Sequence, residues 1–129
     1  MARHNEIGAW GERLAREYLI SKGYTLVDEN LHVGHNELDI IATKDKWMVF
    51  VEVKTRSHGL DEAVEAVDSR KIARMVRAAD AVLRQYTVPY EYRFDVIAVI
   101  GTPEGEHSLY HYPDAFMPPL MTCLLYTSD

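Results

Sequence analysis

The feature that most constrains the fold is a pair of runs with alternating polar and apolar residues, 37–43 (ELDIIAT) and 47–55 (WMVFVEVKT). Alternation with a period of two residues is typical of a β-strand that has one face against a core. The polar residues between the runs, 44–46 (KDK), favour a tight turn. The sequence therefore predicts an antiparallel hairpin in this region.

The alternation also predicts that charged side chains of both strands converge on one face of the hairpin. We expect a tight turn that pairs Thr43 with Lys46. Asp39 then lies opposite Phe50, and directly opposed residues project to the same side. The charged residues expected on this face are Glu37, Asp39, Glu52 and Lys54, and the aliphatic residues expected on the other face are Leu38, Ile40, Ala42, Val49, Val51 and Val53. A turn one residue longer or shorter would break this registration.

Such a charged face indicates a candidate metal site. Three carboxylates close together repel one another unless a cation lies among them. A hard divalent cation such as Mg²⁺ takes oxygen ligands, polarises phosphate oxygens and lowers the pKa of bound water. A neighbouring lysine can stabilise developing negative charge. The alternative is an ordinary half-exposed strand with solvated Glu–Lys pairs, and the spacing alone does not exclude it.

Beyond the hairpin, the sequence predicts two long helices and further strands. Asn5 is a candidate cap for the first helix, and Gly23 follows its end, where a left-handed residue is favoured. Asp68 or Ser69 lies near the cap of the second. The expected helices are 5–21 and 68–86, and the expected further strands are 24–28, 92–100 and 108–112. The order helix, three strands, helix, and one or two strands indicates an α/β domain with a mixed sheet.

The composition predicts a single domain. A chain of 129 residues can bury its own core. One cysteine, Cys123, excludes an intramolecular disulfide and fits a reducing compartment. No run approaches the roughly 20 apolar residues of a membrane span, and the first residues lack the apolar stretch of a secretory signal. We therefore expect a cytoplasmic protein with no membrane segment.

The domain is expected to occupy residues 1–112, followed by a tail over 113–129. The tail contains three prolines and no useful periodicity. We expect it to dock on the domain or to be disordered. Its last residues, 123–129 (CLLYTSD), resemble translated vector sequence more than a natural protein end, so the tail is given no function.

The second predicted helix carries a basic face. Residues 70–84 contain five basic residues and one acid, in a chain whose net charge is −6. Four arginines lie opposite the apolar residues Ile72, Met75, Ala79, Val82 and Tyr86; the basic residues are Arg70, Lys71, Arg74, Arg77 and Arg84. The net charge counts against non-specific coating of nucleic acid, but a local basic face can still contact phosphates. The alternative is a solvated helix surface.

Two other groups of residues have simple explanations. His32, His35 and Glu37 could indicate a zinc site, but no cysteine lies nearby, and surface histidines are the expected reading. Arg93 and Asp95 share one face of a predicted strand and are expected to form a structural ion pair.

At the level of motifs, LDIIA (38–42) followed by VFVEVKTR (49–56) resembles the signature of PD-(D/E)xK nucleases. The chain is more closely similar to the bacterial YraN-like family of uncharacterised proteins, which are related to Holliday junction resolvases. Further matching segments are GAWGE (8–12), NELD (36–39), Lys71 and RFDV (93–96). The resemblance covers residues 5–112. One departure is Asn36, where the family usually has glycine.

The resemblance implies a restriction-endonuclease-like core and a role for each matching position. Asp39 and Glu52 would bind Mg²⁺ or Mn²⁺, together with the carbonyl of Val53. Lys54 would act on the attacking water. Glu12 matches a helix glutamate that completes the site in resolvase-like members, although it could be an ordinary solvated residue.

The function implied is a metal-dependent nuclease acting on DNA, with branched DNA as the expected substrate. A homodimer is expected because a symmetric junction needs two cuts. One rival interpretation is a binding module that keeps the nuclease fold for DNA or a protein partner. Another is a purely structural protein, which would leave the carboxylate cluster unexplained.

Overall fold

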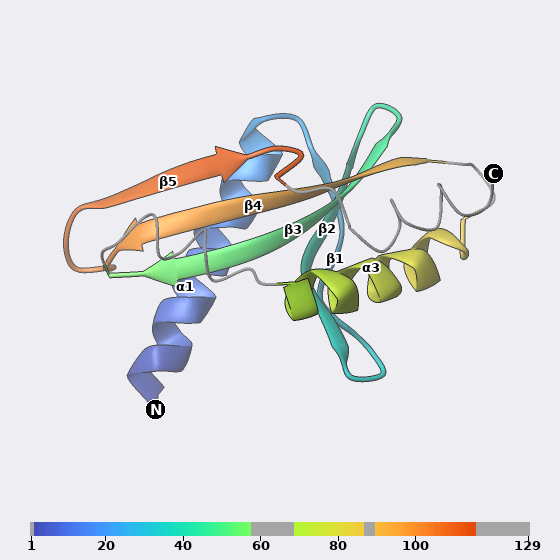
Figure 1. Cartoon of the computed structure of the whole chain (residues 1–129). Coiled ribbons are helices and arrows are strands. Elements are labelled where there is room, and N and C mark those ends of the chain that lie inside the picture. Colours follow the sequence, from blue (N-terminus) through green and yellow to red (C-terminus); the bar gives the residue numbers. More distant parts are fainter. Residues whose placement is uncertain (1, 58–68, 87–89, 116–129) are drawn as a thin grey trace.

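A mixed five-stranded sheet with one helix on each face forms the described part of the protein (Figure 1). The computed structural model describes residues 2–57, 69–86 and 90–115. The helices are α1 (Ala2–Ser21) and α3 (Ser69–Leu83). The strands are β1 (Thr25–Val33), β2 (Asn36–Lys44), β3 (Trp47–Arg56), β4 (Glu91–Gly101) and β5 (His107–Tyr112). The predicted α/β class with a mixed sheet is confirmed.

The strands follow one another across the sheet in chain order, β1-β2-β3-β4-β5. β3 and β4 are parallel, and every other neighbouring pair is antiparallel. Figure 1 shows α1 behind the sheet and α3 in front of it. Each helix covers a separate apolar core. The α1 core contains Trp10, Ala15, Leu19, Ile40, Val49, Val51, Ile97 and Val99, and the α3 core contains Leu38, Ile41, Met48, Phe50, Met75, Val76, Ala78, Ala79, Val82 and Phe94.

The first helix starts earlier than the sequence predicts. α1 begins at Ala2, so Asn5 lies within the helix and its predicted capping role is wrong. No residue between them breaks a helix, and Ala2 has the highest helix propensity. The predicted end is confirmed: Gly23 has φ +92°, and Gly23 N and Tyr24 N donate to the carbonyls of Ile20 and Leu19. These two bonds form a Schellman motif.

The second helix is shorter than predicted. α3 ends at Leu83, and Arg84 and Gln85 form a turn. Of its two candidate caps, Asp68 lies outside the described residues and Ser69 is the first residue of the described helix. Most of the predicted tail, 116–129, is also outside them. The first residues of the tail contact the domain, since Ala115 N donates a hydrogen bond to Phe94 O at 2.8 Å.

The first strand is longer than the predicted 24–28. β1 continues to Val33 through a bulge between Leu26 and Asp28 and through Asn30, which has φ +51°. It then pairs with β2 across a tight turn at Gly34. The polar residues 28–30 hid this continuation because their pattern resembles a loop.

The register of the β2–β3 hairpin is shifted by two residues from the predicted one. Thr43 pairs with Met48 instead of Lys46, and Lys44 pairs with Trp47. The turn therefore consists of Asp45 and Lys46, and Asp45 has the left-handed φ of +54° that such a turn favours. A shift of two residues preserves side-chain alternation, so Phe50 and Val51 still face opposite cores.

β2 separates from β3 after a short paired stretch. Their pairing ends at Ile40 and Val51, although β2 begins at Asn36 and β3 continues to Arg56. In Figure 1 the β1–β2 hairpin turns away from β3 and β4. Leu38 packs in the α3 core and Ile40 in the α1 core, so the prediction that they share a face is wrong. The break in alternation falls at Asp39, where β2 leaves its neighbour.

Candidate functional site

Two buried carboxylates lie together where β2 and β3 separate. Only 9% of Asp39 and 3% of Glu52 are exposed to solvent. The backbone N–H of Val53 donates a hydrogen bond to Asp39 Oδ2 at 2.9 Å. Burial raises the pKa of Glu52 to about 8, with further contributions from its hydrogen bond with Asp39 and from the Asp39 charge. Burial and the neighbouring Asp39 thus both oppose the ionisation of Glu52.

One oxygen of this pair is poorly satisfied. Glu52 Oε2 is buried and has no hydrogen-bond partner among the described residues. Lys71 Nζ lies 3.2 Å away and forms an ion pair with it, but without hydrogen-bond geometry. Buried polar atoms that lack a hydrogen bond are rare and need an explanation. A bound cation would supply the missing interaction, and an adjacent pair of carboxylates suits Mg²⁺ or Mn²⁺.

Glu12 lies on α1, on the face of the sheet opposite to α3, and is close enough to Asp39 for the two charges to interact. Its pKa is raised by partial burial and then by the charge of Asp39, while a hydrogen bond with Asn30 acts in the opposite direction. Glu37 is exposed on β2 and contributes a weaker repulsion to Glu12. Among residues 2–57, 69–86 and 90–115, no three His, Cys, Asp or Glu side chains form a group ready to hold a metal ion. The described carboxylates thus form a close pair with Glu12 nearby, and Glu37 stays outside.

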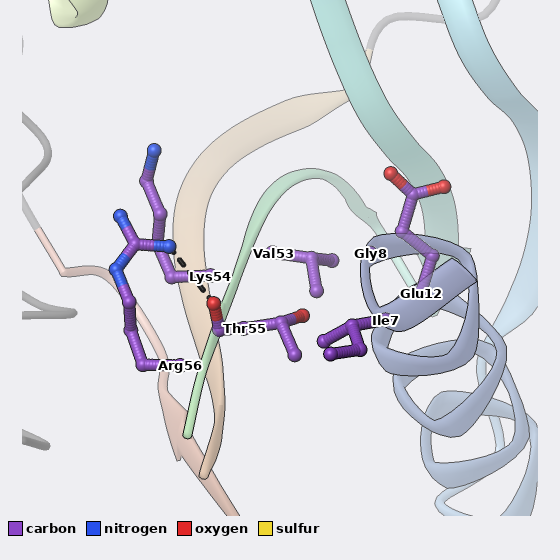
Figure 2. Close-up of a pocket in the computed structure, with 7 residues that line it drawn as sticks. All are labelled: Ile7, Gly8, Glu12, Val53, Lys54, Thr55 and Arg56. Carbon is purple, nitrogen blue, oxygen red and sulfur yellow. Dashed lines mark hydrogen bonds between the residues drawn. The ribbon is translucent and has the colours of Figure 1, made fainter. Parts of the chain in front are cut away.

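A pocket of about 170 Å³ lies between α1 and the end of β3 (Figure 2). Its lining residues are Ile7, Gly8, Glu12, Val53, Lys54, Thr55 and Arg56. Figure 2 shows Val53 and Thr55 pointing toward α1, and Lys54 and Arg56 running side by side away from it. The alternation that selected Glu52 and Lys54 extends to Arg56, which the sequence prediction omitted. Two cations therefore follow Glu52 along the same face of β3.

The close approach of α1 to β3 depends on Gly11. A Cβ at this position would overlap Thr55 Oγ1 and lie 3.0 Å from Thr55 Cβ. The absence of a side chain lets the helix lie against the strand, and Glu12 follows directly. Gly11 thus contributes to placing Glu12 near the carboxylate pair.

The comparisons with known proteins identify the family. Residues 11–99 match the model of an uncharacterised protein family, UPF0102. The chain belongs to UPF0102. A relative from Bacteroides thetaiotaomicron is 48% identical over 93% of this chain and 99% of its own length. Relatives from Parabacteroides distasonis (44% identical, over 92% and 98%) and Syntrophomonas wolfei (39% identical, over 88% and 99%) are also called UPF0102 proteins.

In this UPF0102 chain the predicted basic set does not act as one group. Arg70, Arg74 and Arg77 are exposed on α3. Lys71 is half-buried and contacts Glu52. Arg84 lies past the end of the helix and pairs with Asp80 at 2.8 Å. The predicted apolar side of α3 is buried at its centre, but Tyr86 lies beyond the helix and is 37% exposed.

The predicted ion pair between Arg93 and Asp95 is confirmed and belongs to a larger network. Arg93 donates to both Asp95 oxygens at 2.8 Å and to the Tyr24 hydroxyl at 2.7 Å. His111 Nε2 lies 2.7 Å from Asp95 Oδ2, and its Nδ1 lies 3.0 Å from the Tyr18 hydroxyl. Burial opposes the charge of Asp95, yet hydrogen bonds from His111, Arg93 and the Asp114 backbone hold its pKa below the usual range. This network ties the end of α1 to β4 and β5.

The histidines at the hairpin end show no metal site. His32 and His35 are exposed, and His32 lies opposite Glu37 in the β1–β2 register. Within the described residues, these histidines belong to no group of three His, Cys, Asp or Glu side chains that could bind zinc. No helix in the described ranges is long and apolar enough to cross a membrane.

Proposed function

We propose that this chain is a divalent-metal-dependent nuclease that hydrolyses phosphodiester bonds in branched or otherwise structured DNA. The observation that carries the proposal is the buried Asp39–Glu52 pair, with its unsatisfied Glu52 oxygen, at the point where β2 leaves β3. The element order α1, β1–β3, α3, β4 supports a restriction-endonuclease-like core of the PD-(D/E)xK type.

Asp39 and Glu52 would hold the metal ion, with Glu12 and the carbonyl of Val53 as further candidate ligands. When bound, Mg²⁺ or Mn²⁺ supplies a Lewis acid for a phosphate oxygen and lowers the pKa of water. Asp39 is already oriented by the Val53 N–H. One of the two proposed ligands is therefore held in position before a cation binds.

Lys54 follows Glu52 by two residues and shares its face of β3. Burial raises the pKa of Glu52, and the charge of Lys54 partly offsets this rise, which indicates that the two groups interact. In the reaction, the ammonium group would orient the attacking water and stabilise the negative charge that develops on the phosphate. Arg56, beside Lys54 in Figure 2, adds a second positive charge for the same phosphate or its neighbour.

The exposed arginines of α3 would hold the DNA backbone. Arg70, Arg74 and Arg77 lie on the helix that brings Lys71 to Glu52, so a strand bound there passes close to the carboxylates. Contacts to phosphates position DNA without reading its sequence. A two-fold homodimer would present two such sites to a symmetric junction.

The rival function is binding without cleavage, to DNA or to a protein partner. The observation in its favour is that no group of three metal-binding side chains is preformed in the described residues. Glu12, whose pKa is raised by partial burial and by the charge of Asp39, is the further carboxylate available to the cation under the nuclease proposal.

The test is incubation of the purified protein with linear, flapped and four-way DNA in Mg²⁺, in Mn²⁺ or in chelator. The nuclease proposal predicts cleavage of a structured substrate that requires the metal and is lost in Glu52→Gln. Binding of the same substrates without cleavage under every condition would favour the binding module. Light scattering with and without four-way DNA tests the dimer, and a monomer mass in both would reject it.

A further inference from the structure

Lys71 contacts Glu52 Oε2, the buried oxygen that lacks a hydrogen bond. Its Nζ lies 3.2 Å from Oε2, with 24% of the lysine side chain and 4% of the glutamate side chain exposed. Lys71 comes from the first turns of α3, while Glu52 comes from the middle of β3. The contact therefore joins the basic helix to the carboxylate pair.

The ammonium group of Lys71 and a divalent cation compete for the negative charge of Glu52. Two positive groups near one carboxylate repel each other, and the repulsion is strong where water is largely excluded. A divalent ion brings two positive charges, so it compensates the Asp39–Glu52 pair more completely than one ammonium can. The lysine chain is long and flexible enough to leave when the ion arrives.

We propose that Lys71 is the resident counter-ion of Glu52 and that a divalent metal ion displaces it from Oε2. The inference rests on the proposed function, because it takes Glu52 to be a metal ligand. Once displaced, the ammonium lies beside Arg70 and Arg74 on the same helix, where a DNA phosphate can replace Glu52 as its partner. Lys71 is then a positioning residue that links metal binding to DNA binding.

The first test is calorimetric titration of Mn²⁺ without DNA, at one pH, into wild type, Lys71→Gln, Lys71→Arg and Lys54→Met. Lys71→Gln should bind Mn²⁺ on the order of tenfold more tightly, which corresponds to about 1.4 kcal/mol. Lys71→Arg keeps the competing charge and should stay near the wild-type affinity. Lys54→Met removes a charge that acts on Glu52 more weakly than Lys71 does, and it should change the affinity less than Lys71→Gln.

Protons compete with the metal for Glu52 in all of these proteins. Removal of Lys71 favours proton binding as well, but a proton carries one charge and the metal ion carries two. The ammonium therefore opposes the metal more strongly than it opposes the proton. The net effect of Lys71→Gln should still be tighter metal binding.

The second test measures the link to DNA. Wild type should bind four-way DNA more tightly when Ca²⁺, used as a non-cleaving ion, is present, and the same coupling should appear as tighter Ca²⁺ binding in the presence of DNA. Lys71→Gln should lose most of this coupling. If Lys71→Gln does not fold, nuclear magnetic resonance of labelled lysine side chains in wild type should still show the Lys71 signal moving when Mg²⁺ is added.

The outcomes separate the two proposals. Failure of wild type to bind any divalent ion would overturn the metal site and the displacement of Lys71 together. Metal binding that Glu52→Gln abolishes, with unchanged or weaker affinity in folded Lys71→Gln, would overturn the displacement and leave the metal site standing. An unmoved Lys71 signal in metal-saturated wild type would do the same.

Discussion

The backbone amide of Val53 donates a hydrogen bond to the carboxylate of Asp39, with 2.9 Å between N and Oδ2. β2 and β3 are no longer paired at this point, so a side chain takes the place that a neighbouring strand would otherwise fill. The bond holds Asp39 beside Glu52, which is itself almost fully buried. The opening of the sheet and the pairing of the two carboxylates are thus parts of one structural feature.

The two glycines of α1 at positions 8 and 11 should respond oppositely to alanine. A Cβ at Gly8 meets nothing within 4 Å, so Gly8→Ala should stabilise the protein by up to about 1 kcal/mol through helix propensity. A Cβ at Gly11 overlaps Thr55, so Gly11→Ala should destabilise it by about 1–3 kcal/mol. Denaturant unfolding of both variants measures the difference, and equal effects would contradict the close contact of α1 with β3.

The metal-free protein should lose stability as the pH rises from about 4.5 toward about 8. Glu52 binds its proton more tightly in the folded chain than in the unfolded one, so folding is favoured most where Glu52 is protonated in both. Glu52→Gln is neutral throughout and should flatten this part of the stability profile. The change is on the order of a few kcal/mol. Denaturant unfolding in chelator across this pH range measures the change, and the same slope in wild type and Glu52→Gln would contradict the prediction.

Asp95, whose pKa is lowered, affects stability in a separate pH window, because the stability that it contributes is lost only as the pH falls below 3.8.

The sequence predicted the elements of the fold better than it predicted their register. Alternation identified β2 and β3, and apolar periodicity identified both helices. The predicted pairing at the turn was wrong. Nothing in residues 43–47 favours the predicted Thr43–Lys46 pair over the observed Lys44–Trp47 pair. The shift was harmless for β3, since a change of two residues keeps each side chain on its face.

The candidate site shows what alternation cannot predict. Asp39 occupies the point where β2 changes direction, and the regular pattern that selected it also placed Leu38 and Ile40 on one face, which is wrong. The contact of Lys71 with Glu52 joins residues from separate elements, and no local pattern encodes it. His111 and Tyr18, which complete the Asp95 network, lie 93 residues apart.

Lys54→Met should abolish cleavage while fold and metal affinity stay close to those of wild type. The proposed role of Lys54 is to act on water and on charge that develops in the transition state, and Lys54 is not a ligand. Arg13→Met, which removes an exposed charge on α1, serves as a control that should retain cleavage. The measurement is the cleavage rate of each variant on any substrate that the wild type cuts. A wild-type rate in Lys54→Met would reject the proposed catalytic role of Lys54.

Replacing Arg74 and Arg77 with Gln should weaken DNA binding for all sequences. Each lost phosphate contact should lower the salt slope of binding by about 0.9. The matched control, Lys22→Gln with Lys46→Gln, removes one charge directly after α1 and one in the β2–β3 turn, and it should leave the slope unchanged. Binding measured over a range of salt concentrations compares them. If the α3 variant and the control bound alike, the arginines would be an ordinary solvated surface.

The most direct measurement is calorimetric titration of Mn²⁺ into wild type, Asp39→Asn and Glu52→Gln, because it needs no knowledge of the DNA substrate. The central claim is that Asp39 and Glu52 bind a divalent cation at the opening between β2 and β3. Wild type should show a saturable site that each substitution abolishes, in proteins whose circular dichroism is unchanged. Equal Mn²⁺ affinity in all three proteins would contradict the claim.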